Sequence, residues 1–180
     1  MIVAKRLKEQ NVAEWLLYMW QVEDLLRSVS LDVDKLEDSY LSRFQLEGEQ
    51  KTELRRWYED LAEMMRSEGV TESGHVQICK NMIIWLDDLH RQLLKSPKHP
   101  VYSATYYQAL PFIVELRQKS TSQDKSEIEN CFDALYGLML LRLQGKPVNE
   151  ETKKAMDCIS KFIALLAEYY RKDKTEGIEL

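Results

Sequence analysis

Two acid–histidine pairs are the residues whose types and spacing come closest to metal chemistry. Glu72 precedes His75 by three positions, and Asp87 precedes His90 by the same interval in a looser match. Di-metal carboxylate sites in helical bundles take such a pair from each of two helices. Both pairs here fall on one predicted helix, 15 residues apart, or about 22 Å at 1.5 Å per residue. Bridged ions lie only about 4 Å apart, so the two pairs would share a site only across a dimer.

A smaller metal site would combine His75 with Cys79, four positions further along the same predicted helix. Two ligands are too few for a structural zinc ion, and no other His or Cys is close in sequence. We therefore interpret His75 as a helix-start residue above a buried Cys79. Glu72, His75 and Cys79 are the candidate metal ligands, and we expect neither a metal nor another cofactor.

Three polar side chains share one face of the first strongly predicted helix. Glu14, Tyr18 and Gln21 stand at positions i, i+4 and i+7 of a segment that is otherwise apolar nearly all round. A helix of this kind is normally surrounded by others, and buried polar groups need partners. The three side chains are therefore expected either to form a satisfied structural network or to line an internal pocket for a small molecule.

A tyrosine-rich stretch is the candidate interaction site. Tyr102, Tyr106 and Tyr107 precede Pro111 within one predicted helix. Exposed tyrosines beside a kinked helix can form a binding groove or a dimer contact. The default interpretation, however, is that Tyr102 and Tyr106 pack into the core.

Signatures of nucleophilic catalysis are missing from the sequence. It has no Gly-x-Ser-x-Gly turn, no catalytic-cysteine signature and no Gly-rich phosphate loop. The chain has only 3 His, so it offers few candidates for a general acid or base. Glu23 and Arg27 have the spacing of an i,i+4 ion pair on a helix surface. We lean toward the absence of enzymatic activity.

Charge and hydropathy limit the classes of partner and the cellular compartment that the sequence favours. The net charge is −5, and the absence of a basic stripe argues against nucleic acid. No run approaches the ~20 apolar residues of a membrane span. Basic residues before Val12–Trp20 resemble a signal peptide, but Glu14 interrupts the apolar stretch and no small-residue cleavage site follows. With 3 Cys and no C-x-x-C pair, the sequence favours a reducing, cytoplasmic setting.

The elements that must position these residues are helices. Only 6 Gly and 4 Pro occur, mostly between segments with 3–4 apolar spacing, which favours a single-domain all-α bundle. The first helix is expected at its centre, and the fifth is expected to kink at Pro111. Residues 1–10 are expected to extend the first helix, to cross another helix or to fray, and residues 173–180 are expected to fray. Seven helices are predicted over about Asn11–Ser28, Asp32–Phe44, Glu49–Ser67, Glu72–Leu94, Tyr102–Leu116, Ile128–Leu141 and Asn149–Tyr170.

The opening of the chain also carries a family resemblance. Residues 1–27, MIVAKRLKEQNVAEWLLYMWQVEDLLR, and the Leu31-Asp32-Val33-Asp34 that follows resemble a family of uncharacterised helical proteins from Bacteroides-type bacteria, a domain of unknown function of about this size. The resemblance implies an all-helical fold in the bacterial cytoplasm and supplies no activity or catalytic residue. We expect a non-enzymatic binding or assembly module that engages a protein partner or itself. The alternative is a small-molecule- or metal-binding protein with an internal pocket.

Overall fold

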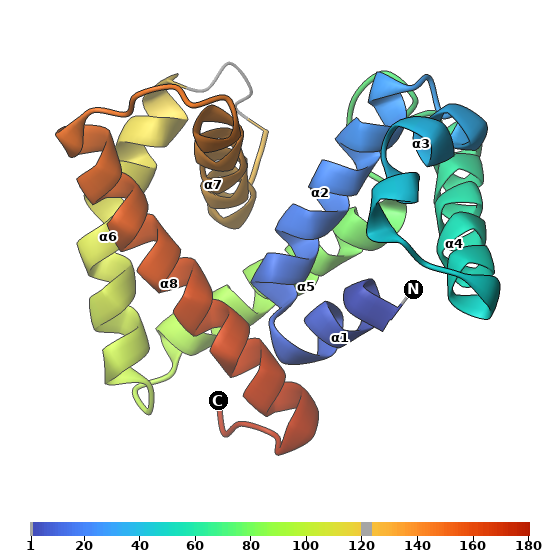
Figure 1. Ribbon diagram of the computed structural model, residues 1–180. Coiled ribbons are helices and arrows are strands. Elements are labelled where there is room, and N and C mark those ends of the chain that lie inside the picture. Colours follow the sequence, from blue (N-terminus) through green and yellow to red (C-terminus); the bar gives the residue numbers. More distant parts are fainter. Residues whose placement is uncertain (1, 120–123) are drawn as a thin grey trace. The chain divides into compact units, whose positions relative to one another are not determined.

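The computed structural model describes residues 2–119 and 124–180, and within them the chain is all-helical, as predicted. This described part contains eight α-helices, one short 3₁₀ helix and no strand (Figure 1). The elements in chain order are α1 (Ile2–Gln10), α2 (Val12–Ser28), α3 (Val33–Ser39), η1 (Leu41–Phe44), α4 (Gly48–Ser67), α5 (Gln77–Lys95), α6 (Pro100–Lys119), α7 (Glu127–Leu143) and α8 (Glu150–Thr175).

The helix that raises the α-helix count above the predicted seven lies at the N-terminus. Residues 2–10, for which a helical extension, a crossing and fraying were all considered, form α1. Asn11 separates α1 from α2, and its Oδ1 accepts a hydrogen bond from the Ala13 N–H over 3.1 Å. The side chain thus satisfies a free amide of the first turn of α2, as an N-cap residue does. At the other end, α8 extends to Thr175, two residues beyond the expected start of the frayed tail.

The start of α5 differs from the sequence prediction by five residues. The predicted helix begins at Glu72, whereas α5 begins at Gln77. Gly69 and Gly74 adopt φ values of 70° and 86°, which glycine tolerates without steric cost, so the intervening chain forms a loop. Residues 69–76 are called the 69–76 loop below.

A kink or break was expected near Leu110, but α6 continues through Pro111 without a break. The helix runs from Pro100 to Lys119 with Pro111 inside it. Pro111 is exposed, and because its ring lies on the solvent side, the missing amide does not leave a buried carbonyl without water.

Two compact units make up the chain. The first comprises α1, most of α2, α3, η1, α4 and the start of α5; the second comprises the rest of α5 with α6, α7 and α8. The expectation of a single domain stays a prediction.

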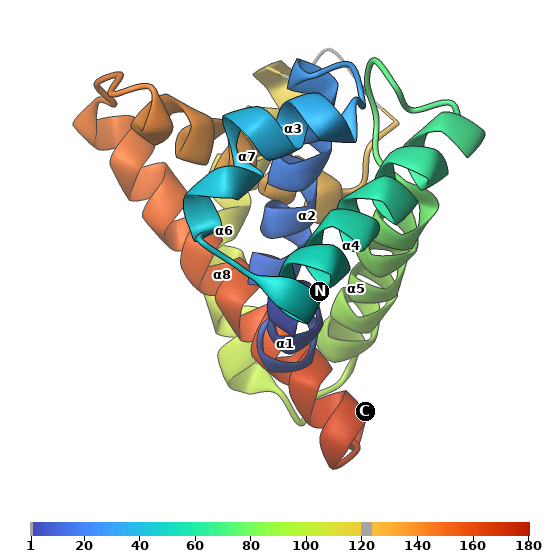
Figure 2. The same ribbon diagram turned by 45° about the vertical axis from the view of Figure 1, so that its right-hand side comes forward.

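The first unit is built on α2 and α4. The Tyr18 ring of α2 stacks on the Trp57 ring of α4, with centroids 6.4 Å apart, and α3 lies beside α4 (Figure 2). Glu14 and Gln21 of α2 are exposed, so this helix is not enclosed on all sides as the prediction had it. Its buried face carries Val12, Trp15, Leu16, Met19, Trp20, Val22, Glu23 and Leu26.

The second unit has its core where α6 meets α7 and α8, which lie beside it in Figure 1. The inward positions of α6 follow 3–4 spacing, the apolar repeat of a core-facing helix. The buried side chains of this core include Tyr102, Tyr106, Ala109, Ile113, Phe132, Phe162 and Ile163.

Candidate functional site

The polar face predicted on α2 does not enclose a pocket. Glu14 and Gln21 are exposed, and Tyr18 is half-buried. The Tyr18 hydroxyl hydrogen-bonds with Tyr58, and burial raises the pKa of Tyr18. Because two of the three side chains face solvent, they do not line the internal cavity that the small-molecule alternative requires.

The predicted metal candidates are also separated. Glu72 is exposed in the 69–76 loop, His75 lies in the same loop, and Cys79 is buried in α5. His75 and Cys79 therefore do not share a helix face, because only Cys79 is helical. Among residues 2–119 and 124–180, no cluster of three or more His, Cys, Asp or Glu side chains is arranged to hold a metal ion.

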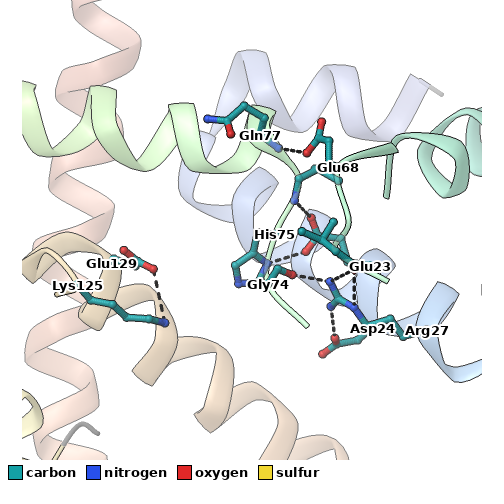
Figure 3. A network of polar contacts seen from close by, with 11 residues as sticks. Glu23, Asp24, Arg27, Glu68, Gly74, His75, Gln77, Lys125 and Glu129 are labelled. Atoms are coloured by element: carbon teal, nitrogen blue, oxygen red, sulfur yellow. Dashed lines mark hydrogen bonds and ion pairs between the residues drawn. The ribbon is translucent and has the colours of Figure 1, made fainter. Parts of the chain in front are cut away.

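A buried carboxylate that the sequence reading placed on the surface joins His75 to Cys79. Glu23 is fully buried and accepts hydrogen bonds from His75 Nδ1 over 2.6 Å and from the Val76 N–H over 3.0 Å (Figure 3). The Cys79 thiol hydrogen-bonds with the same carboxylate. We call Glu23, His75 and Cys79 the Glu23 centre. Since an ionised carboxylate only accepts, the proton of the imidazole–carboxylate bond lies on Nδ1.

The His75 ring is further fixed by an aromatic contact. It stacks on the Trp20 ring with centroids 4.0 Å apart and planes inclined by 10°. The side chain keeps about a quarter of its surface exposed (24%), so the imidazole lies at the edge of the core. A carboxylate that orients an imidazole supplies two members of a catalytic triad. The third member, a nucleophile, is not supplied by Cys79, because burial and then the negative charge of Glu23 raise the pKa of its thiol.

Arg27 holds the same loop one helical turn further along α2. Its Nη2 donates to the Val70 carbonyl over 3.1 Å and also to the Gly74 carbonyl, while Nη1 pairs with Asp24 over 2.8 Å (Figure 3). The predicted Glu23–Arg27 ion pair is therefore replaced by a different arrangement. Two side chains at i and i+4 on α2 both bind the 69–76 loop, one as a carboxylate and one as a guanidinium.

The second acid–histidine pair belongs to the core of the second unit. His90 is buried, and its Nδ1 lies 2.7 Å from the Tyr102 hydroxyl. Its ring packs against those of Tyr106 and Phe162, with centroids 4.8 and 5.4 Å away. Burial lowers the pKa of His90 to about 4, so the imidazole is neutral at pH 7 and is shielded from solvent by aromatic rings.

The three predicted interaction tyrosines separate into two groups. Tyr102 and Tyr106 are buried, and the Tyr106 hydroxyl donates to Glu127 over 2.8 Å. Burial raises the pKa of both phenols. Tyr107 is 62% exposed, so only the last of the three is available at the surface.

Tyr107 lies within an exposed apolar stripe. Val101, at 67%, and Val114, at 43%, are also strongly exposed, and no charged residue occurs between Pro100 and Val114. We define the α6 face as the outward residues Val101, Ala104, Tyr107, Gln108, Pro111 and Val114.

A groove between α3 and α4 was not anticipated from the sequence. It is open, has a volume of about 630 Å³, and is lined by acidic residues of both helices together with Arg55 and Arg66. Arg55 pairs with Asp34 over 2.6 Å, and Arg66 donates to the Leu31 carbonyl over 2.8 Å. The lining is thus largely engaged in exposed ion pairs, which contribute little to stability.

Comparison with known proteins identifies a family but no activity. The model of the family described as a domain of unknown function (DUF4924) matches residues 1–177. No curated protein and no solved structure is significantly similar to the chain. Across the helices of the described ranges, none is both long and apolar enough to cross a membrane.

Proposed function

Because the chain belongs to the DUF4924 family of unknown function, we propose from its geometry that it is a non-enzymatic helical module that binds a protein through the α6 face. The partner is another protein or a second copy of the chain. The single observation that carries this proposal is the exposed, uncharged apolar stripe centred on Tyr107.

The stripe is unusual because α6 is apolar on two opposite sides. Its inward side packs against α7 and α8, yet Val101, Tyr107 and Val114 point outward with large exposed fractions. A helix that is apolar on both sides is normally buried on both. Isolated exposed apolar residues are common, but a contiguous patch without charge is typical of an interaction surface.

The state of the potential catalytic groups supports the non-enzymatic part of the proposal. His90 is buried and neutral, and His75 is bound to the Glu23 carboxylate. Burial raises the pKa of Cys79 and of Cys131, which disfavours the nucleophilic thiolate. These contacts account for the two histidines of the acid–histidine pairs as structural elements.

Charge and thiol chemistry support the proposed setting. The net charge of −5 disfavours a nucleic-acid partner. Cys79, Cys131 and Cys158 are free thiols, as is usual in a reducing compartment. We therefore place the protein in the cytoplasm, and the family resemblance of residues 1–27 points to Bacteroides-type bacteria.

Photo-cross-linking in the native host tests the proposal. A benzophenone amino acid replaces Tyr107 on the α6 face in one variant and Phe44, which is 47% exposed, in the control. We expect a discrete protein adduct from position 107 that is absent from position 44 and is lost when Val101→Glu is added. Equal, diffuse labelling at both positions would contradict the proposed function.

A further inference from the structure

We infer that residues 96–99, the connection between α5 and α6, form a binding site for an acidic segment of a partner protein, and that residues 177–180 of the chain itself occupy this site as a displaceable strap. The two segments are called the 96–99 loop and the strap below. Both belong to the second unit. The site uses none of the residues of the α6 face, so the inference goes beyond the proposed function and does not depend on it.

Glu179 makes the polar contacts between the strap and the 96–99 loop. After α8 the chain turns back at Gly177, which has a φ of 74°, and returns to the loop (Figure 1). The Glu179 carboxylate pairs with Lys98 Nζ over 2.9 Å, and the Glu179 carbonyl accepts a hydrogen bond from His99 Nε2 over 2.8 Å. Two adjacent loop residues thus hold one side-chain group and one main-chain group of the same acidic residue.

The 96–99 loop keeps its shape through contacts that do not involve the strap. Ser96 is buried, and its Oγ accepts a hydrogen bond from the Lys98 N–H over 3.3 Å. The His99 ring packs edge-on against the Tyr169 ring of α8, with centroids 5.1 Å apart. The prolines that flank Lys98 and His99 also restrict the backbone. The backbone at Lys98 and the His99 ring therefore stay in place to receive another segment when the strap leaves, and such preorganisation lowers the cost of binding.

The strap itself is weakly held. The side chains of Lys98 and Glu179 are 52% and 86% exposed, and ion pairs as exposed as this one contribute little to stability because water and salt screen them. Leu180 is 46% exposed, so it adds little apolar burial. Local opening of such a segment does not require the helices of the second unit to unfold.

The chemistry of the site selects an acidic segment of a protein. Its two contacts use one carboxylate and one main-chain carbonyl, which any glutamate in an extended peptide presents. The surroundings of the loop favour negative charge, although the net charge of the chain is −5. Lys95 is exposed three positions before Lys98, and no acidic residue occurs from Arg91 to Val114. An acidic segment therefore meets attraction here rather than the repulsion expected from the chain as a whole.

A labelled peptide with the sequence of residues 173–180, DKTEGIEL, tests the site. Fluorescence anisotropy measures its binding to the full wild-type chain and to the full chain with Glu179→Lys, which removes the ion pair of the strap. We expect this variant to bind the peptide about threefold more tightly or better, because its own strap no longer competes. Glu176→Lys is the matched control, since it makes the same change of charge at an exposed side chain three positions earlier, and it should bind as the wild type does.

Two further measurements locate the bound peptide. Lys98→Ala added to Glu179→Lys should reduce the affinity about threefold or more, and a peptide carrying Glu179→Gln should bind correspondingly more weakly. In NMR spectra, the imidazole signals of His99 should move in Glu179→Lys and return toward their wild-type positions when the peptide is added. The inference would be overturned by the absence of binding to Glu179→Lys, by equal affinities of the wild type and Glu179→Lys, or by binding that is insensitive to Lys98→Ala.

Discussion

The Glu23 carboxylate and the His75 imidazole lie 2.6 Å apart although 52 positions separate them in the sequence. This contact closes the 69–76 loop onto α2, and Glu23 also accepts the Val76 N–H just before α5 begins. A fully buried carboxylate without such donors would carry a large desolvation cost. The pair is therefore a structural element of the first unit, and its removal should lower the free energy of unfolding of the protein.

Replacing Glu23 by Gln should destabilise the protein by about 2 kcal/mol, because hydrogen bonds to a charged group contribute about 1.5–3 kcal/mol. The amide keeps the shape but not the charge that receives the His75 Nδ1–H. Urea unfolding followed by circular dichroism measures the change. Glu14→Gln, at an exposed position of the same helix, is the control and should shift stability by less than about 0.5 kcal/mol. Equal effects of the two substitutions would contradict the structural role of Glu23.

Arg27→Lys should loosen the 69–76 loop while leaving α2 intact. A lysine supplies one ammonium group in place of the planar fork, so it cannot reproduce the paired bonds to the Val70 and Gly74 carbonyls. We expect faster amide hydrogen exchange in this loop. Arg56→Lys on the exposed side of α4 is the control, and unchanged exchange in the Arg27 variant would show that the loop is held by other contacts.

Acid should destabilise the second unit through His90. The pKa of this buried imidazole is lowered to about 4 from an unfolded value of about 6.5. Between these values the unfolded chain binds more protons than the folded chain, so stability contributed by neutral His90 is present above about pH 6.5 and falls as the pH drops. The loss should reach about 3 kcal/mol at pH 4. Imidazole NMR titration should show His90 neutral at pH 5; a His90 midpoint near 6.5 would contradict the buried site.

Two adjacent tyrosines offer a matched comparison. Tyr106→Phe removes the hydroxyl that donates to Glu127 and should cost about 1–2 kcal/mol, since a part-buried carboxylate loses one of its hydrogen bonds and keeps only the contact with Arg117 over 3.3 Å. Tyr107→Phe removes a hydroxyl from an exposed ring and should be close to neutral. Thermal unfolding of the two variants tests this difference, and the reverse order of stabilities would count against the assigned orientation of α6.

The helices themselves could be predicted because apolar periodicity and helix-breaking residues are local signals. The departures occur where a local signal was overridden or misread. Asn11, the first residue of the predicted first helix, caps α2, and the nine residues before it form a helix of their own. Gly74 has a positive φ inside the loop, so the predicted helix start at Glu72 lies five residues before the start of α5 at Gln77.

The candidate site was harder to predict because its contacts are distant in sequence. Glu23 is four positions from Arg27, a spacing typical of a surface ion pair, while its actual partners His75 and Val76 are more than 50 positions away. On α6 the signal was present: Tyr102, Tyr106, Ala109 and Ile113 share the inward 3–4 repeat, which leaves Tyr107 outside it. The interpretation that Tyr102 and Tyr106 pack into the core is therefore confirmed, and only Tyr107 stays exposed.

Accessibility of the α6 face inside the cell tests the central claim most directly. In a Cys158→Ser background, Tyr107→Cys and the control Leu143→Cys are each labelled with a cell-permeant maleimide, in intact cells and in dilute purified protein. If a partner covers the α6 face, labelling at position 107 is several-fold slower in cells than in dilute solution, whereas labelling at position 143 is the same in both. Equal rates at position 107 in the two settings would contradict the account.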